Sequence, residues 1–323
     1  MRIIASENFL GCYNQAIMPV TLLAFGGILI ASIFWATSGT VAKLLFGTFD
    51  PFAIAFFRTA TASLFLLPLF WKMNTHKFTH LMRDVLPVAL AFTVNFLFFY
   101  VGVSKTTANA AAIIYVGTPL IAALIAHFFI GERTTRQKMV GVFVGLVGSI
   151  LILVLPAFEK GKGISGDLWG NIYIALATVS WALYTVGSRR LSVQKQYSPI
   201  IITSISTFIC ALTFLAIVIS MPHKTNIFLS FLAPYNLLWF VYLAFFVTIV
   251  TNYLFQWAIK HSSTLMATLT HYLQPVFAFI FNSLLLGEQL TPGMIAGSII
   301  SMVGVFLATG TGMMRMAKTL RKG

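Results

Sequence analysis

The stretch YVGTPLIAALIAHFFIGE at residues 115–132 recurs as HYLQPVFAFIFNSLLLGE at residues 271–288. Each copy carries a proline, then an apolar run, then a terminal Gly-Glu pair, at a constant offset of 156 residues (271 − 115). Several matches at one offset are hard to obtain by chance. The sequence therefore predicts an internal repeat, which has to be settled before any single segment is interpreted.

The repeat extends on both sides of this stretch. Upstream, matching residues at an offset of 146 (174 − 28) are Ile28, Ala31, Trp35 and Ala36 with Ile174, Ala177, Trp181 and Ala182, and at 148 (199 − 51) Pro51 with Pro199. Downstream, at 156, they are Thr135, Gly141, Gly148 and Leu151 with Thr291, Gly297, Gly304 and Leu307. The offset grows because the second copy has a longer break near residues 223–224.

The composition is that of a membrane protein. Of the 323 residues, 59% are hydrophobic and 9% charged, against roughly a quarter charged in soluble domains. The apolar residues come in blocks of about 20, the length that crosses roughly 30 Å of hydrocarbon. We expect helices, because lipid offers backbone groups no partner. The ten predicted spans are residues 18–42, 51–71, 84–103, 107–130, 136–155, 168–187, 199–220, 235–258, 263–286 and 292–311.

Basic residues indicate the orientation. With the N-terminus inside, 15 of the 21 Lys and Arg residues fall on the cytoplasmic side, five fall outside, and Arg58 lies within a span. We expect a bacterial inner-membrane protein with both termini cytoplasmic. The net charge of +14 follows from this topology, so no nucleic-acid partner is expected. The two cysteines, Cys12 and Cys210, predict neither a disulfide nor a metal site, and no cofactor is expected.

Five spans are an odd number, so the second copy should cross the membrane upside down. The fold class expected is an all-α integral membrane protein of two inverted five-helix repeats, the architecture of alternating-access carriers with a site near mid-membrane. The expected segments are a cytoplasmic tail (1–17), a first repeat (18–155), a periplasmic linker (156–167), a second repeat (168–311) and a basic cytoplasmic tail (312–323).

At these motifs the chain resembles the EamA-type members of the drug/metabolite transporter superfamily. The first copy offers Trp35…Ser38…Lys43…Pro51…Arg58…Ala62 and then Pro119…Gly131-Glu132…Gly141…Gly148. The second offers WALYTVGSRRL at residues 181–191 and then Pro275…Gly287-Glu288…Gly297…Gly304. The resemblance covers residues 20–311 and implies a ten-helix fold with a central cavity and, often, export of amino acids or other metabolites.

This chain departs from the family pattern at a few positions. Ala36 stands where the family often has Gly, and Ser206 stands where the first repeat has Arg58. His271 and Gln274 lie in a run that is usually blander, which makes them candidates for individual specificity.

We expect a cavity with aromatic walls and neutral hydrogen-bonding groups. Such a site suits a zwitterionic or amphipathic small molecule better than a polyanion. The predicted substrate-binding residues are Trp35, Ser38, Arg58, Asn95, Tyr100, Tyr115, Thr118, Trp181, Tyr184, Asn252, Gln256, His271 and Gln274. No catalytic residue is predicted, because no paired carboxylates and no Ser/His/Asp spacing occur.

Two of these residues have alternative interpretations. Asp84 is the first residue of its predicted span, and no Asp or Glu lies farther inside any span. His271 is therefore the candidate for proton coupling, since an ordinary histidine titrates near pH 6.5; the alternative is a neutral His bonded to a neighbouring helix. Arg58 is either a counter-charge for a substrate carboxylate or phosphate, or a structural or gating residue. Because it belongs to the general family pattern, we favour the second role.

Other residues are predicted to be structural. Pro119 and Pro275 should kink their spans, and the pairs Gly131-Glu132 and Gly287-Glu288 should end one helix and cap the next. Small residues (Gly141, Gly145 and Gly148, repeated as Gly297, Ser301 and Gly304) form ridges for close helix packing, either within the chain or in a homodimer.

The predicted function is a secondary transporter that exports amino acids or related metabolites. The alternative is an uptake or exchange carrier for a larger metabolite, such as a nucleotide-type or S-adenosyl compound. An intramembrane enzyme or a scaffold is disfavoured.

Overall fold

The computed structural model describes residues 4–69, 75–106, 111, 114–159, 167–221, 226–286 and 292–320. These residues form helices and connecting turns, with no strand among them. The first half holds α1 (Ile4–Leu45), α2 (Pro51–Leu66), the short η1 (Leu67–Leu69), α3 (Thr75–Lys105), α5 (Thr118–Ile130) and α6 (Arg136–Glu159). The all-helical fold class is thereby confirmed.

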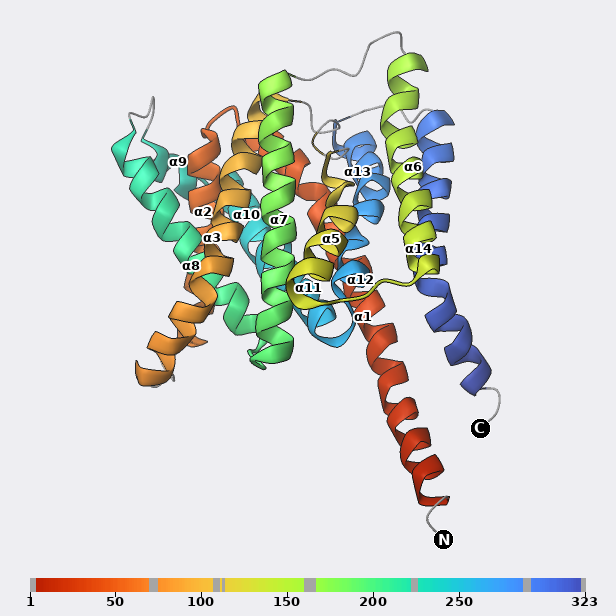
Figure 1. The fold of residues 1–323 in the computed structure, drawn as a ribbon. Coiled ribbons are helices and arrows are strands. Elements are labelled where there is room, and N and C mark those ends of the chain that lie inside the picture. The colour runs from red at the N-terminus through yellow and green to blue at the C-terminus, as the bar shows by residue number, and fades with distance from the viewer. Residues whose placement is uncertain are drawn as a thin grey trace.

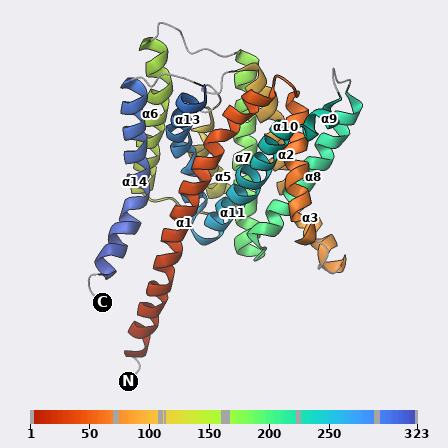
Figure 2. The same ribbon diagram turned by 180° about the vertical axis from the view of Figure 1, so that it is seen from behind.

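The second half holds α7 (Leu168–Gln194), α8 (Pro199–Ser220), α9 (Ile227–Leu232), α10 (Pro234–Ala244), the π-helical η2 (Phe245–Val250), α11 (Thr251–His261), α12 (Thr264–Thr268), α13 (Thr270–Leu286) and α14 (Pro292–Leu320). In Figures 1 and 2, α6 and α14 lie together at one edge of the bundle, and α2, α8 and α9 at the other. The first turns of α1 and the last turns of α14 project from the same end (Figure 1).

Helix starts follow the sequence signals. Asp50 caps α2 by accepting hydrogen bonds from Phe52 N and Ala53 N, each at 2.9 Å, and Asp167 caps α7 by accepting one from Gly170 N at 3.0 Å. The predicted helix starts at Pro51, Pro199 and Pro292 are confirmed, since proline lacks only an N–H that the first turn leaves free.

Helix ends agree in part. Gly131 ends α5 with φ of +67°, a left-handed conformation that glycine adopts without steric cost. Gly287 and Glu288 lie outside the described residues. Pro275 lies inside α13, as predicted. The prediction for Pro119 is wrong in position: α5 begins at Thr118, so Pro119 occupies the first turn and displaces no hydrogen bond.

Segments at the predicted boundaries are more helical than expected. Residues 4–17, predicted as a tail, are the first turns of α1, and residues 156–159 of the predicted linker complete α6. Residues 160–166 lie outside the described part. The predicted C-terminal tail continues α14 as far as Leu320.

Five helical segments among the described residues are long and apolar enough to cross a membrane. They are Leu23–Leu45, Pro51–Leu69, Thr79–Lys105, Pro199–Ser220 and Pro234–His261, and two shorter apolar helices are Thr118–Ile130 and Ile295–Ala308. The last of the five contains the π-helical η2, so the predicted single span 235–258 is α10, η2 and α11 in sequence. Several apolar helices of this protein can therefore cross a lipid bilayer.

The small-residue ridges of α6 and α14 face each other within the chain. A Cβ atom at Gly304 would overlap the backbone of Gly145, and one at Gly148 would overlap the backbone of Ser301. Such close approach allows dense backbone packing between apolar helices. These ridges are used internally, so a homodimer, which stays a prediction, would need another surface.

The two halves make matching contacts with each other. Helix α1 packs against α11 and α13, and α7 packs against α3 and α5. In detail, Ala24 and Ile28 of α1 cluster with Ala258 of α11, while Ile174 of α7 contacts Gly102 of α3 closely enough that a Cβ there would clash. By the offsets of 146 and 156, Ile174 is the repeat counterpart of Ile28 and Gly102 that of Ala258.

The α6–α14 contact gives a stability prediction. Gly304→Val should lower the thermal unfolding temperature of the purified protein, because overpacking a close contact costs about 1–3 kcal/mol. Gly26→Ala is the matched control, since a Cβ at Gly26 meets nothing within 4 Å; it should leave that temperature unchanged or raise it. Equal unfolding temperatures for the two variants would contradict the packing described.

Candidate functional site

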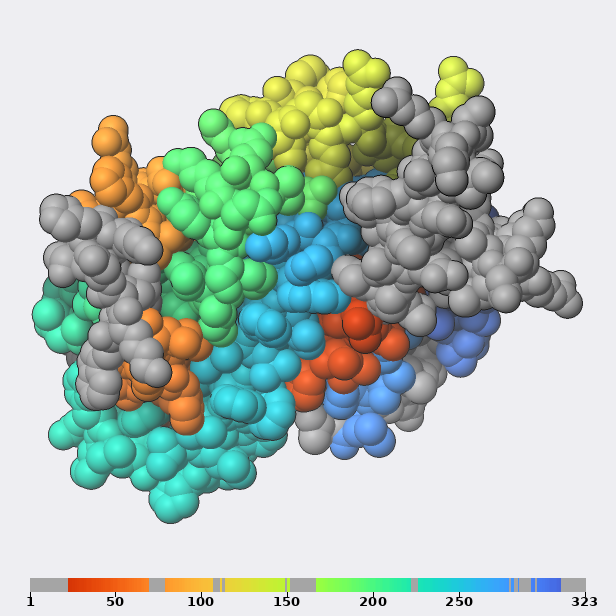
Figure 3. Space-filling view, turned by 90° about the horizontal axis from the view of Figure 1, so that it is seen from below, coloured from red at the N-terminus to blue at the C-terminus, as the bar shows by residue number. Residues whose placement is uncertain are grey.

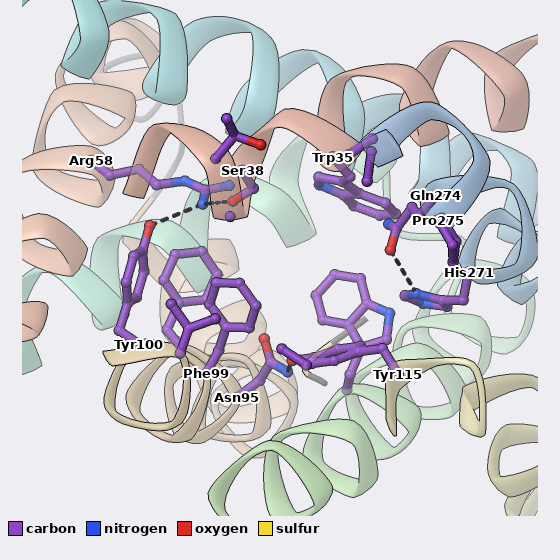
Figure 4. A pocket seen from close by; sticks show the side chains of 18 of the residues that line it. Trp35, Ser38, Arg58, Asn95, Phe99, Tyr100, Tyr115, His271, Gln274 and Pro275 are labelled. Carbon is purple, nitrogen blue, oxygen red and sulfur yellow. Dashed lines mark hydrogen bonds between the residues drawn. The ribbon is translucent and has the colours of Figure 1, made fainter. Parts of the chain in front are cut away.

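A cavity of about 140 Å³ lies among the helices of both halves. Helices α1, α2, α3, α7, α11 and α13, with the segment before α5, border it, and a pocket between helices is a common location for small-molecule sites. Its lining residues are Trp35, Ala36, Ser38, Gly39, Thr40, Arg58, Asn95, Phe96, Phe99, Tyr100, Val103, Ala111, Tyr115, Trp181, Asn252, His271, Gln274, Pro275 and Ala278. Figure 4 shows Arg58, Ser38 and Tyr100 at one end and His271, Gln274 and Pro275 at the other.

Arg58 supplies the cavity with a positive charge. Its side chain is 4% exposed, and it donates hydrogen bonds to Ser38 Oγ at 2.9 Å and Tyr100 OH at 3.1 Å from Nη1. Because both hydroxyls accept from the guanidinium, their own O–H protons remain available for another acceptor. We call Arg58, Ser38 and Tyr100 the cationic half-site.

The π-helical segment η2 completes the setting of Arg58. Arg58 Nε donates to Thr248 Oγ1 at 2.7 Å, and Nη2 donates to the Val247 carbonyl oxygen at 2.8 Å. A π-helix displaces backbone hydrogen bonds from the α-helical pattern and is frequent at functional sites. The ion pairs found among the described residues join Arg189 to Glu132 and Lys195 to Asp84, so within the described part Arg58 has neutral partners in place of a carboxylate.

The other end of the cavity is aromatic. The rings of Trp35 and Trp181 meet edge to face at 5.3 Å between centroids, and the His271 ring lies parallel to Trp35 at 6.3 Å and tilted on Tyr115 at 5.8 Å. Trp35 and Trp181 are counterparts in the repeat, as are Tyr115 and His271. Residues that correspond in the two copies therefore meet at the centre of the molecule.

Several polar atoms around the cavity have no hydrogen-bond partner among the described residues. They are Trp181 Nε1, Asn252 Oδ1 and His271 Nε2, and His271 Nδ1 lies 3.3 Å from Gln274 Oε1. Asn95 is better satisfied, since its Nδ2 donates to Tyr115 OH at 2.6 Å and to the Ala177 carbonyl oxygen at 2.8 Å. Buried polar atoms are normally paired, so this donor and these acceptors are open to a ligand.

Ten of the predicted binding residues border the cavity, and three do not. Thr118 bonds back to the Tyr115 carbonyl oxygen at 2.6 Å, and Tyr184 and Gln256 are fully buried outside the lining. The sequence interpretation missed Phe96, Phe99 and Val103. They share one face of α3 with Asn95 and Tyr100, so helical periodicity from those two residues was the available signal.

A polar cluster joins the two halves of the chain at one end of the bundle, which we call the closed end. Glu132 accepts hydrogen bonds from Thr264 N at 3.1 Å and Thr264 Oγ1 at 2.8 Å, and lies 3.9 Å from Arg189. Arg189 Nη1 donates to the carbonyl oxygens of Ile259 and Lys260. Glu132 thus caps α12 of the second half. The sequence had predicted that it would cap α6, the helix that follows it in the chain. In Figure 3, cyan and light-blue segments around α11 and α12 fill the space between α7 and α1 at this end.

Comparison with known proteins agrees with this architecture. The model of the EamA-like transporter family matches residues 22–154 and 168–310. An uncharacterized transporter of Clostridium kluyveri is 27% identical over 286 residues, covering 86% of this chain and 90% of its own length. The uncharacterized inner membrane transporter YedA of Escherichia coli K12 is 26% identical, covering 83% of this chain and 84% of its own.

A solved crystal structure shares the fold with a TM-score of 0.70 at 18% identity, covering 91% of this chain and 97% of the other. The two matched segments of the family model correspond to the two copies of the repeat and together cover most of the sequence. This chain therefore belongs to the EamA-like transporter family of the drug/metabolite transporter superfamily.

Proposed function

We propose that this protein is a secondary transporter that exports amino acids or related small zwitterions across the inner membrane by alternating access. The observation that carries the proposal is Arg58: a buried guanidinium that borders a cavity and is held by neutral groups. A charge in a membrane-spanning segment is costly and is by default functional. A substrate carboxylate would supply the missing counter-charge. The position of Arg58 in the cavity lining is the reason to prefer this role over the structural or gating role that the sequence favoured.

The proposal includes ten spans arranged as two inverted repeats, and the α6–α14 contact supports it. The offset of 156 converts Gly145 into Ser301 and Gly148 into Gly304. The contact of Gly145 with Gly304 therefore becomes the contact of Ser301 with Gly148, and both occur. A two-fold axis produces such pairs: if residue i of one copy contacts residue j of the other, then j of the first copy contacts i of the second. Because α6 and α14 run in opposite directions in Figure 1, that axis crosses the helices and would lie in the membrane plane.

The two ends of the bundle repeat a second contact. Lys43, near the end of α1, donates to the Thr106 carbonyl oxygen at 3.3 Å, just beyond α3. Arg189, its counterpart at an offset of 146, donates to carbonyl oxygens near the end of α11. In an inverted repeat these contacts would lie on opposite sides of the membrane. With both termini in the cytoplasm, the Glu132–Arg189 cluster closes the cytoplasmic side.

The cavity suits a zwitterion. Ser38 and Tyr100 can donate to a carboxylate beside Arg58, and the acceptor Asn252 Oδ1 with the faces of Trp35 and Trp181 suits an ammonium group. A nucleotide with several phosphates would meet one cation in this lining, so the amino-acid class fits better. The relatives are named as transporters of unassigned substrate, which leaves this assignment to experiment.

Replacing Arg58 tests the counter-charge. Arg58→Gln in proteoliposomes should weaken counterflow exchange of radiolabelled L-amino acids by roughly 10–100-fold in apparent affinity, because hydrogen bonds to charged groups contribute about 1.5–3 kcal/mol. Arg58→Lys should keep part of the activity, since it retains the charge without the fork of donors. Thermal unfolding controls for folding.

Exchange by Arg58→Gln at the normal affinity would refute the role of Arg58. If the unmodified protein exchanges none of the radiolabelled L-amino acids tested, amino acids are refuted as the substrate class.

His271 is proposed to couple transport to protons. His271 borders the cavity, and within the part of the chain that the structure describes its Nε2 has no hydrogen-bond partner. His271→Gln should abolish uptake driven by a pH gradient while counterflow exchange stays within about threefold of normal, because exchange needs no net proton movement. Equal loss of both activities would place His271 in binding or folding, and no loss would remove it from coupling.

A further inference from the structure

A second polar cluster lies buried between the cavity and the closed end. Gln256 Nε2 donates hydrogen bonds to Tyr184 OH at 2.7 Å and to Ser188 Oγ at 2.8 Å. The Ser206 hydroxyl lies beside the Tyr184 hydroxyl. Among the described residues, Ser206 Oγ makes no hydrogen bond of good geometry. All four residues are fully buried, and Gln256 Oε1 has no hydrogen-bond partner in the described ranges of the chain.

Chain order places this cluster. Along α7, Trp181 borders the cavity, Tyr184 and Ser188 follow, and Arg189 joins the closed end. Along α11, Asn252 borders the cavity, Gln256 follows one turn later, and Ile259 and Lys260 join the closed end. The cluster therefore lies where a path from the cavity to the other side of the bundle would run.

The repeat relates this cluster to the cationic half-site. By the offsets found in the sequence, Ser38 corresponds to Tyr184 (146), Arg58 to Ser206 (148) and Tyr100 to Gln256 (156). The three residues of one cluster thus correspond, one by one, to three residues of the other. Each trio is connected through one member: Arg58 donates to both Ser38 and Tyr100, and Tyr184 contacts both Gln256 and Ser206. The two clusters differ in charge, because Arg58 of the first corresponds to the uncharged Ser206 of the second.

We propose that Tyr184, Ser206 and Gln256, with Ser188, form a neutral half-site that binds the polar end of the same zwitterionic substrate once the cavity opens toward the cytoplasm. The proposal rests on the alternating-access function above. In an inverted repeat, exchange of the conformations of the two copies exposes each cluster in turn. The cationic half-site borders the cavity now, and the neutral half-site is buried.

The difference in charge has a functional consequence. A carboxylate in the outward cavity meets a guanidinium and two hydroxyl donors, whereas in the inward cavity it would meet hydroxyl and amide groups alone. Hydrogen bonds to neutral groups contribute less than those to charged groups. The open acceptor Gln256 Oε1 and the unsatisfied Ser206 hydroxyl give this half-site one acceptor and one donor. Substrate should therefore bind more weakly from the cytoplasmic side, and with less dependence on its carboxylate.

Thiol labelling tests the proposal without knowledge of the substrate. The background is the full chain with Cys12→Ser and Cys210→Ala, carrying either Ser206→Cys or Ser38→Cys, each with and without Glu132→Ala. The last change removes the acceptor that holds the closed end. The probes are impermeant cationic and anionic methanethiosulfonates, added from one side of sealed, oriented vesicles. Leu212→Cys is the matched control on α8, since Leu212 is 50% exposed on the outer surface of the bundle and its thiol should not react with charged reagents.

Glu132→Ala should accelerate labelling of Ser206→Cys from the cytoplasmic side at least fivefold and slow labelling of Ser38→Cys from the periplasmic side. The anionic reagent should be favoured at Ser38→Cys relative to a free thiol, and not at Ser206→Cys. Labelling of both thiols from the same side, or an unreactive Ser206→Cys while Ser38→Cys labelling falls, would overturn the neutral half-site. If neither thiol reacts from either side, the transport cavity itself is refuted. Equal labelling of denatured samples confirms that each thiol is present.

Discussion

Polar groups in these apolar helices must find partners within the protein, because hydrocarbon supplies none and an unpaired buried group costs several kcal/mol. Most hydroxyls meet this constraint locally. Thr59, Thr93 and Thr178 each donate to the carbonyl oxygen four residues earlier, at 2.7–2.9 Å. The polar atoms that stay unsatisfied include Trp181 Nε1, Asn252 Oδ1 and His271 Nε2 at the cavity and Ser206 Oγ and Gln256 Oε1 below it. Ser63, Ser192, Thr203 and Trp239 also carry buried atoms without a partner elsewhere in the described part of the chain. A missing partner therefore points to a ligand only where the atom also borders the cavity or the path that leads from it.

The sequence predicted the helices and most of the cavity for a physical reason. Span length and proline positions are local patterns, so α2 and α8 followed directly from them, and the repeat could be seen as matching residues at a fixed offset. The repeat relates Trp35 to Trp181 and Tyr115 to His271, and in the structure the ring centroids of these pairs lie 5.3 Å and 5.8 Å apart. The contact of Arg58 with η2 and the capping of α12 by Glu132 were not predictable, since both join segments more than 100 residues apart.

The two copies have diverged in chemistry while keeping their packing. Small residues persist at the α6–α14, α1–α11 and α3–α7 contacts, because close backbone approach tolerates little change. The polar clusters are free of that limit: one copy carries Arg58, and the other carries Ser206 at the corresponding position. A transporter with two like conformations can in this way hold its substrate differently on the two sides. The closed cluster of Glu132 and Arg189 would set which conformation is preferred at rest.

In the proposed architecture the two copies cross the membrane in opposite directions around a shared cavity. Its most direct test is the side from which Arg133→Cys and Gln289→Cys, counterparts at an offset of 156, react with an impermeant maleimide in intact cells and in everted vesicles. The account predicts labelling of residue 133 from the cytoplasm and of residue 289 from the periplasm. Labelling of both residues from the same side would contradict the inverted architecture and the transport mechanism built on it.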